Sequence, residues 1–205
     1  MFENHIMTTS HEELTKKLQE KEERKRVSQF KKTLKTRLMT TRFNTITRNQ
    51  NEIYRNMHWK SGCIYCAPIL VNKEIPYGSK MIILEMDNDK NEIFALGLLT
   101  NKPFTSKFSV YEENNYNRFN YAGKYRIKRE ECSEEEENIL LMLDFLCFKG
   151  NHHMKRGQGI TAFPAKTLWK LSENFNITEF LESMFHARFV GVGKPTVSPT
   201  TPSLT

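Results

Sequence analysis

The residues from Gly150 to Pro164, GNHHMKRGQGITAFP, combine hydrogen-bond donors and backbone freedom as no other stretch of this sequence does. Its cationic and imidazole side chains, together with the lysine just before it, are Lys149, His152, His153, Lys155 and Arg156. Gly157 and Gly159 flank Gln158 and would let backbone N–H groups turn toward an anion. The stretch predicts a turn that faces phosphate; the alternative is a surface connection with solvated charges.

The pair Cys63-Ile-Tyr-Cys66 has the spacing of a zinc knuckle or of a redox pair. A zinc site needs two further ligands, which His152 and His153 could supply only if the fold brought them near. The residues between the two thiols favour a strand, in which Cys63 and Cys66 face opposite sides and cannot share one ion. We expect packing cysteines, no metal and no cofactor, with zinc and redox roles as the alternatives.

No group of residues with a catalytic spacing can be named. The carboxylates cluster in solvated runs, and residues 157–159 precede a strand rather than a helix, unlike a nucleotide-binding glycine loop. Asp144 is the one charged residue in ILLMLDFLCF and is expected to have a structural partner. We therefore expect a protein that is not an enzyme. Acid–base chemistry by His152 or His153 is the weakest of the functional alternatives.

Positive charge is concentrated near the N-terminus. Residues 1–60 hold 14 Lys and Arg against 7 Asp and Glu, whereas residues 61–205 hold 17 of each kind, so the net charge of +7 belongs to the first 60 residues. Such an asymmetry is typical of a basic arm that meets a polyanion, either nucleic acid or an acidic membrane face. The alternative is a basic helix that is simply solvated.

The first 51 residues are expected to be a basic helical arm and a linker. A helix over residues 11–39 would carry an apolar stripe that docks on the body or on a second copy: Val27, Phe30, Leu34 and Leu38. The lysines nearest this stripe that would face solvent are Lys31, Lys32 and Lys35. Residues 40–51 are rich in Thr and Asn and predict a linker. Residues 191–205 are rich in Pro, Ser and Thr and are expected to be disordered.

Residues 52–190 are expected to form an α+β domain that opens with a short helix entering the core. Strands are predicted at CIYCAPILV, Lys80–Met86, Glu92–Leu99, KYRIKRE and 159–163, the second and third forming a hairpin. Gly97 inside a strand predicts a bulge or a close backbone approach. The helix Glu134–Phe148, capped by Ser133 and Glu136, is apolar almost all round and is expected to be buried centrally.

Recognition of bases would need aromatic platforms and amides beside the phosphate-facing turn. The candidates are Trp59, Tyr65, Tyr121, Tyr125 and Gln158. Each aromatic side chain could equally belong to the core.

The order strand, IPYGSKMIILEM, EIFALGLLTN, aromatic loop, KYRI, helix and glycine loop resembles a PUA-like β-barrel of the EVE and ASCH kind. The segments CIYCAP, MIILEMDNDKNEIFALGLLTNK, NRFNYAGKYRI and FKGNHHMKRGQGITAFP also resemble uncharacterised proteins of large nucleocytoplasmic DNA viruses, over roughly residues 52–170. The resemblance implies a small mixed β-barrel with flanking helices that binds RNA or modified bases. No defining EVE or ASCH motif is intact, so no residue role is carried over.

Taken together, these features predict a nucleic-acid-binding protein, with RNA a better candidate than DNA. The alternative is a viral structural or assembly protein that docks through its N-terminal helix, which could also form a homo-oligomer. The start of the chain, MFENHIMTTS, has no signal-peptide pattern and no run of about 18 apolar residues occurs. We therefore expect no membrane partner and an intracellular location, in the host-cell cytoplasm or the virion if the protein is viral.

Overall fold

The computed structural model of the chain describes residues 2–58, 62–105, 108–150 and 153–189, with the backbone alone for residues 2–12. Five strands of the described residues form the main sheet, in the order β6 (Tyr125–Lys128), β4 (Glu92–Thr100), β3 (Lys80–Asp87), β1 (Thr36–Phe43) and β7 (Thr161–Ala162). β1 and β3 are parallel, and the other neighbours are antiparallel. A second sheet pairs β2 (Cys63–Ala67) with β5 (Phe119–Gly123).

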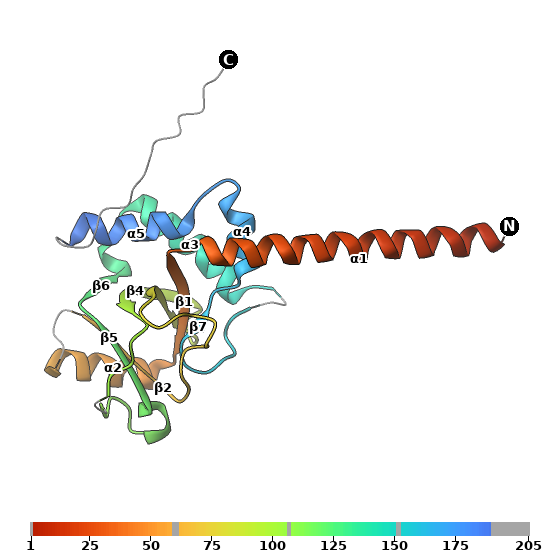
Figure 1. Cartoon of the computed structure of the whole chain (residues 1–205). Coiled ribbons are helices and arrows are strands. Elements are labelled where there is room, and N and C mark those ends of the chain that lie inside the picture. Colours follow the sequence, from red (N-terminus) through yellow and green to blue (C-terminus); the bar gives the residue numbers. More distant parts are fainter. Residues whose placement is uncertain (1, 59–61, 106–107, 151–152, 190–205) are drawn as a thin grey trace, which may run out of the picture.

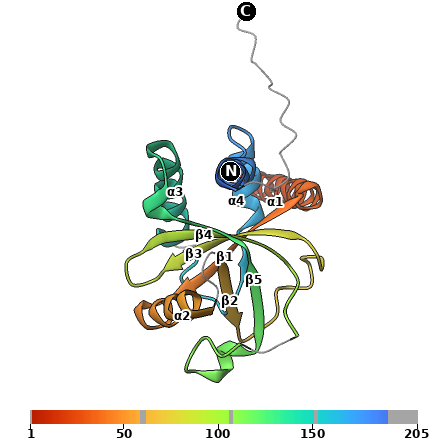
Figure 2. The same cartoon turned by 90° about the vertical axis from the view of Figure 1, so that its left-hand side faces the viewer.

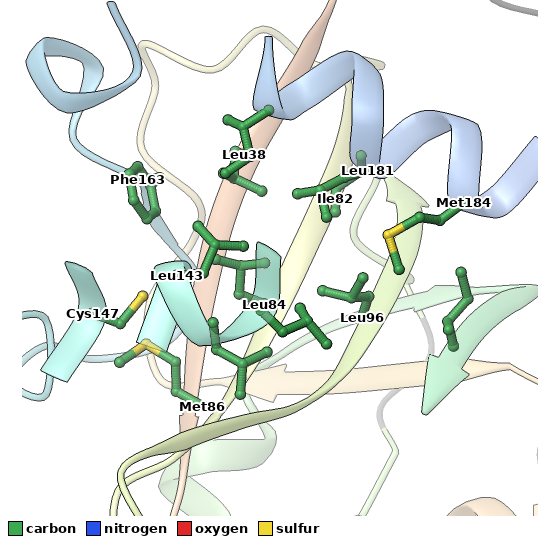
Figure 3. Packing of buried hydrophobic residues seen from close by; sticks show 14 of the residues in the cluster. Leu38, Ile82, Leu84, Met86, Leu96, Leu143, Cys147, Phe163, Leu181 and Met184 are labelled. Atoms are coloured by element: carbon green, nitrogen blue, oxygen red, sulfur yellow. The ribbon is translucent and has the colours of Figure 1, made fainter. Parts of the chain in front are cut away.

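The main sheet separates two hydrophobic cores, because its central strand β3 is buried on both faces and alternates its side chains between them. Figure 2 shows the two layers on either side of this sheet. One core, called the helix-side core, lies under the helices α3 (Glu134–Phe148), α4 (Ala165–Ser172) and α5 (Ile177–Arg188). The sheet residues of this core that Figure 3 labels are Leu38, Ile82, Leu84, Met86 and Leu96, and the helix residues are Leu143, Cys147, Leu181 and Met184.

The other core, called the sheet-side core, lies between the main sheet and the β2–β5 sheet. It contains a buried ion pair. Glu85 of β3 and Arg126 of β6 are joined at 2.7 Å, with side chains 2% and 6% exposed. The Tyr65 hydroxyl donates to Glu85 at 2.8 Å. A Cβ at Gly97 would lie 1.9 Å from that hydroxyl, which confirms the predicted close backbone approach.

The N-terminal segment differs from the sequence prediction. α1 (Phe2–Thr33) ends before residue 39, and Thr36–Phe43 is the strand β1 next to the centre of the sheet. The helix α2 (Thr45–His58) begins within the predicted linker, residues 40–51, and continues through the segment where a short helix was expected. The three threonines and the apolar residues of TRLMTTRF suit a strand buried on both faces. Segments assigned to the arm and linker therefore pack with the body.

α1 leaves the body as a long rod (Figure 1). Phe30 and Leu34 pack against the helix-side core, as the predicted stripe required, while Leu38 is part of β1 and is buried there. Glu23 pairs with Lys166 of α4 at 2.7 Å. The base of α1 is thus fixed to α4 and the core, and the part before Glu23 projects away from them.

α2 presents its polar side to the body. Arg48 pairs with Asp87 at 2.8 Å, and the Asn51 amide donates to the Ile64 carbonyl at 2.8 Å. Its apolar residues Ile46, Ile53 and Met57 are 48–66% exposed. The expected helix is present and its Tyr54 packs against the sheet-side core, whereas the expectation that Ile53 and Met57 also enter the core is wrong.

α3 has the predicted bounds and the predicted capping box between Ser133 and Glu136. It is not buried all round, however, since Leu141 and Phe145 are 52% and 67% exposed. Asp144 has the structural partner expected of it, Arg129 at 2.7 Å. The helix lies on the sheet through one face and leaves an apolar stripe outside.

The α+β class is confirmed, as is the hairpin of β3 and β4. Within the described residues the strands form an open five-stranded sheet and a separate pair, not a closed barrel. No helix of the described residues is both long enough and apolar enough to span a bilayer. The tail predicted to be disordered, 191–205, lies outside the described residues.

Candidate anion-binding cavity

A cavity of about 210 Å³ opens where β1 ends, between the stretch Gly150 to Pro164 (the glycine loop), the N-terminus of α2 and the aromatic loop before β5. The residues that line it are Thr41, Arg42, Phe43, Asn44, Thr47, Cys66, Pro68, Asn88, Tyr111, Tyr116, Lys155, Gly157, Gln158 and Gly159. Arg42 and Lys155 are cations, and no carboxylate is present among these described residues. The balance of charge in the lining therefore favours an anion.

Arg42 is the central cation of this cavity. Its guanidinium donates to the Met154 carbonyl at 2.5 Å and to the Thr161 hydroxyl at 2.9 Å. Burial lowers the pKa of Arg42, and the described residues offer its guanidinium no carboxylate partner. Most buried arginines are paired with a carboxylate. The positive charge of Arg42 is not compensated by one among the described residues, and a bound anion would compensate it.

The glycine loop is held from two sides. Arg42 anchors both of its ends through Met154 and Thr161, and the Asn88 amide donates to the Lys155 carbonyl at 3.1 Å. Gly157 and Gly159 have φ angles of 145° and 65°, and a Cβ at Gly157 would lie 3.0 Å from the Arg42 guanidinium carbon. The loop can lie this close to the arginine because it has no side chain there.

Asn88 leaves a polar atom without a partner at the edge of the cavity. Its Oδ1 is buried and accepts no hydrogen bond from the described residues, although its amide nitrogen is bonded to the loop. An unsatisfied buried acceptor is unfavourable, and a donor of a bound molecule or a water would satisfy it.

The N-terminus of α2 forms another wall. Asn44 caps the helix by accepting from the Thr47 amide at 2.8 Å, and the Thr47 hydroxyl accepts from the Asn44 amide at 3.1 Å. The positive end of the helix dipole is therefore directed at the cavity. Outside the lining, Asp89 accepts from Thr45 at 2.7 Å, and these bonds and the charge of Lys155 hold its pKa below the ordinary value.

Two tyrosines close the remaining side. Tyr111 and Tyr116 are in edge contact, with ring centroids 6.2 Å apart. Tyr111 is buried and its hydroxyl accepts from Asn51 at 3.3 Å, whereas Tyr116 is 36% exposed. The Asn117 side chain bonds the Tyr111 backbone in both directions, at 3.0 and 2.6 Å, and holds this loop in place. Tyr116 therefore offers a partly exposed ring on a fixed support.

The structure brings only part of the predicted site together. Lys155, Gly157, Gln158 and Gly159 line the cavity, whereas Lys149, His153 and Arg156 are not part of its lining. Lys149 and Arg156 are exposed nearby in sequence. The Nδ1 atom of His153 is buried without a hydrogen-bond partner among the described residues. His152 lies outside the described residues.

The predicted aromatic platforms do not join this site. Tyr65 and Tyr121 are each 1% exposed, and their hydroxyls bond Glu85 and the Val71 amide, so no base could stack on them. Tyr125 lies toward the other end of β4, paired with Leu98, and packs on Phe189 at 5.0 Å. Trp59 lies outside the described residues. These tyrosines are core or surface packing residues because the strands turn them away from the cavity.

The lysines of the arm lie at the opposite end of β1. Lys31 and Lys32 line a separate cavity of about 510 Å³ with Arg37 and the start of α4, and Lys31 pairs with Glu74 at 3.3 Å. Lys35 is exposed in the short link to β1. The strand spans about 23 Å at its usual rise, so a ligand touching both places must be extended.

Cys63 and Cys66 lie in β2 and are buried in the sheet-side core. Burial raises the pKa of each thiol to about 12, which disfavours the thiolate that zinc binding or redox exchange needs. The described residues contain no cluster of three metal-ligating His, Cys, Asp or Glu side chains. Packing is the role that fits both cysteines.

Sequence reasoning missed several residues of the cavity: Arg42, Asn44, Thr47, Asn88, Tyr111 and Tyr116. The first three fall in the segment assigned to a linker. An Asn three residues before a Thr is a helix-cap signal, and it could have marked the start of α2. Asn88 and the tyrosines carry no local signal, since only the fold brings them to the glycine loop.

No protein-family model, no curated protein and no solved structure matches this chain.

Proposed function

We propose that this chain binds nucleic acid, single-stranded RNA in preference to DNA, and that a backbone phosphate occupies the cavity between Arg42 and Lys155. The observation that carries the proposal is the unpaired, part-buried guanidinium of Arg42 beneath a glycine loop, in a lining with two cations and no carboxylate among its described residues. Backbone N–H groups and cations in such an arrangement suit phosphate.

The neighbouring groups support a single strand. Tyr116 offers a partly exposed ring on which an unpaired base could stack, and Asn44, Thr47 and Gln158 offer neutral hydrogen-bonding groups beside the cations. Such groups can bond a ribose 2′-hydroxyl, which is the basis for the preference for RNA. A cavity of about 210 Å³ has room for part of a nucleotide and not for a duplex.

We further propose that the two sheets represent a PUA-like arrangement left open on one side. The support is the resemblance of the β2, β3–β4, β5–β6 and glycine-loop segments to PUA-like domains. Lys31, Lys32 and Lys35 would add salt-sensitive contacts to a nucleic-acid strand long enough to reach over the surface from the cavity to the opposite end of β1.

The test is binding of labelled single-stranded RNA, single-stranded DNA and duplex DNA of one sequence, measured by fluorescence anisotropy at several salt concentrations. Lys155→Ala should weaken RNA binding and reduce the steepness of its salt dependence by about 0.7, the change expected for one phosphate contact on a single strand. Lys124→Ala is the matched control, since Lys124 is exposed and lines a different cavity.

Tyr116→Ala should weaken binding by about 1–3 kcal/mol, the usual contribution of one stacked base. The proposal is wrong if no nucleic acid binds at low salt, or if Lys124→Ala and Lys155→Ala have equal effects. Deleting residues 1–50 is not a suitable test, because that deletion also removes β1.

In the stripe of Val27, Phe30, Leu34 and Leu38, three of the four residues are occupied within the chain itself and are not available for an assembly contact. Phe30 and Leu34 pack on the protein's own core, and Leu38 lies inside the sheet. An assembly contact through α1 would have to use another side of the helix.

A further inference from the structure

The outer side of α1 carries a stripe with two different halves. Leu14, Leu18, Lys21 and Lys25 follow one another at spacings of four, three and four, which places them on one face of the helix. Leu14 and Leu18 are 59% and 56% exposed, and both lysines are exposed. This face lies on the other side of the helix from Phe30 and Leu34, so the body leaves it uncovered.

α3 exposes a stripe with the same spacing and the reverse order of halves. Glu134, Asn138, Leu141 and Phe145 are all exposed and also follow at four, three and four. The glutamates nearest the body, Glu136 and Glu137, are paired with Arg188 and Arg129. Glu134 has no ion-pair partner among the described residues.

Laid antiparallel, the two stripes are complementary in both polarity and charge. Leu14 then faces Phe145, and Leu18 faces Leu141. The polar halves meet as Lys21 with Asn138 and Lys25 with Glu134. In the parallel direction Leu14 would face Glu134 and Lys25 would face Phe145, so the complementarity selects one orientation. The alternating spacing of three and four is that of helices packed side by side in coiled coils.

We propose that α1 of one copy packs antiparallel on the outer face of α3 of a second copy. Figure 1 shows α1 leading away from the body, so that its free part cannot fold back onto the α3 of its own chain. The part of a helix that extends beyond its own tertiary contacts is only marginally stable, and a partner stabilises it. Made reciprocally, the contact occurs twice and closes a two-fold dimer.

This interface is separate from the proposed nucleic-acid site. Its residues belong to the far part of α1 and to α3, whereas no described residue of either helix lines the cavity. The dimer can therefore exist whether or not the cavity binds nucleic acid, and its test is carried out on protein freed of nucleic acid.

The test is the molar mass of the full chain, measured by sedimentation equilibrium over a range of concentrations. Wild-type protein should form a dimer, and Phe145→Glu should raise its dissociation constant by about tenfold or more, since a charge replaces an apolar side chain at both contacts. Ile53→Glu is the matched control, because it places the same charge at an exposed apolar position of α2.

Charge reversal tests the orientation. Lys25→Glu and Glu134→Lys should each weaken the dimer, by about threefold to tenfold for an exposed pair made twice. An equimolar mixture of the two single variants should restore the dimer, as should the double variant, because each altered helix then meets an opposite charge.

Three results would overturn the proposal. The first is a monomer at every concentration. The second is a dimer that Ile53→Glu dissociates and Phe145→Glu does not, which would place the interface on α2. The third is a dimer weakened by both charge reversals but not restored by mixing them, since the lysine and the glutamate would then not face each other.

Discussion

Among single residues, Glu85 sets a pH dependence of stability. Burial raises the pKa of Glu85, but the charge and hydrogen bonds of Arg126 and the Tyr65 hydroxyl outweigh this and hold it below the ordinary value of 4.5. The folded state therefore binds its proton more weakly than the unfolded state does. The stability that ionised Glu85 contributes is present above about pH 4.5 and is lost as the pH falls through the lower, folded pKa.

We predict that Glu85→Gln lowers the free energy of unfolding at pH 7 by about 3–5 kcal/mol, because Arg126 is left as an unpaired buried charge. The difference from wild type should narrow below about pH 4.5, as the pH falls toward the lower, folded pKa of Glu85. Urea unfolding of wild type and variant, at pH 7 and at a pH below 4.5, measures the two free energies of unfolding and their difference. Glu130→Gln is the control, since Glu130 is exposed and its change should stay under about 1 kcal/mol. A difference that is equal at both pH values would contradict this account.

The cavity shows which single residues the sequence can identify. Lys155, Gly157, Gln158 and Gly159 could be predicted because donors and glycines that lie together in the chain also line one cavity. Tyr65 and Tyr121 were predicted for their residue type alone, and their environment decided otherwise: each is buried with its hydroxyl bonded. Arg42 shows the converse, because it became a candidate only when the fold showed that no carboxylate of the described residues pairs with it.

Among the elements, α1 and β1 contribute very differently to the stability of the fold, although only two residues separate them. Before Glu23, the described side chains of α1 make no ion pair with the body. In β1, Leu38, Met39 and Phe43 are buried, and the strand pairs with β3 and β7. The arm should therefore be dispensable for the fold of a single copy, and the strand should not.

We predict that removing residues 1–22 changes the free energy of unfolding by less than about 1 kcal/mol, because the shortened chain loses only surface interactions. The comparison is made at concentrations where both chains are monomeric. A chain lacking residues 1–43 should not fold, since the sheet loses a strand buried on both faces. Circular dichroism during thermal unfolding compares the two. A cooperative transition in the shorter chain would contradict this view of β1.

The elements that the sequence predicts well are those whose signals are local. Ser133 and Glu136 mark the start of α3, Asn176 marks the start of α5, and the loop before Glu92 marks the β3–β4 hairpin. β1 was missed because Leu34 and Leu38 continue the helical spacing of Phe30, and TRLMTTRF, buried on both faces, shows no period-two alternation that would point to a strand. The polar inner face of α2 was missed because its ion pairs depend on Asp87, which is distant in the chain.

For the whole molecule, the two proposals use separate parts of the surface. The anion cavity lies at the end of β1 beside α2, and the proposed contact with a second copy uses α1 and α3. A dimer of this kind would carry two cavities, one in each copy. The basic charge of the first 60 residues would then serve both surfaces, since Lys25 belongs to one and Arg42 to the other.

The pairing of β1 with β7 has a consequence for synthesis on the ribosome. Thr40 and its partner Thr161 are 121 positions apart, so β1 emerges long before the strand that covers its outer edge. Until then the nascent chain presents an unpaired strand edge, a state prone to pairing with other chains. A fragment ending at residue 158 should accumulate soluble aggregates, detectable by light scattering, while the full chain does not. β7 thus acts late, as a cover that protects the edge of the growing sheet from neighbouring chains.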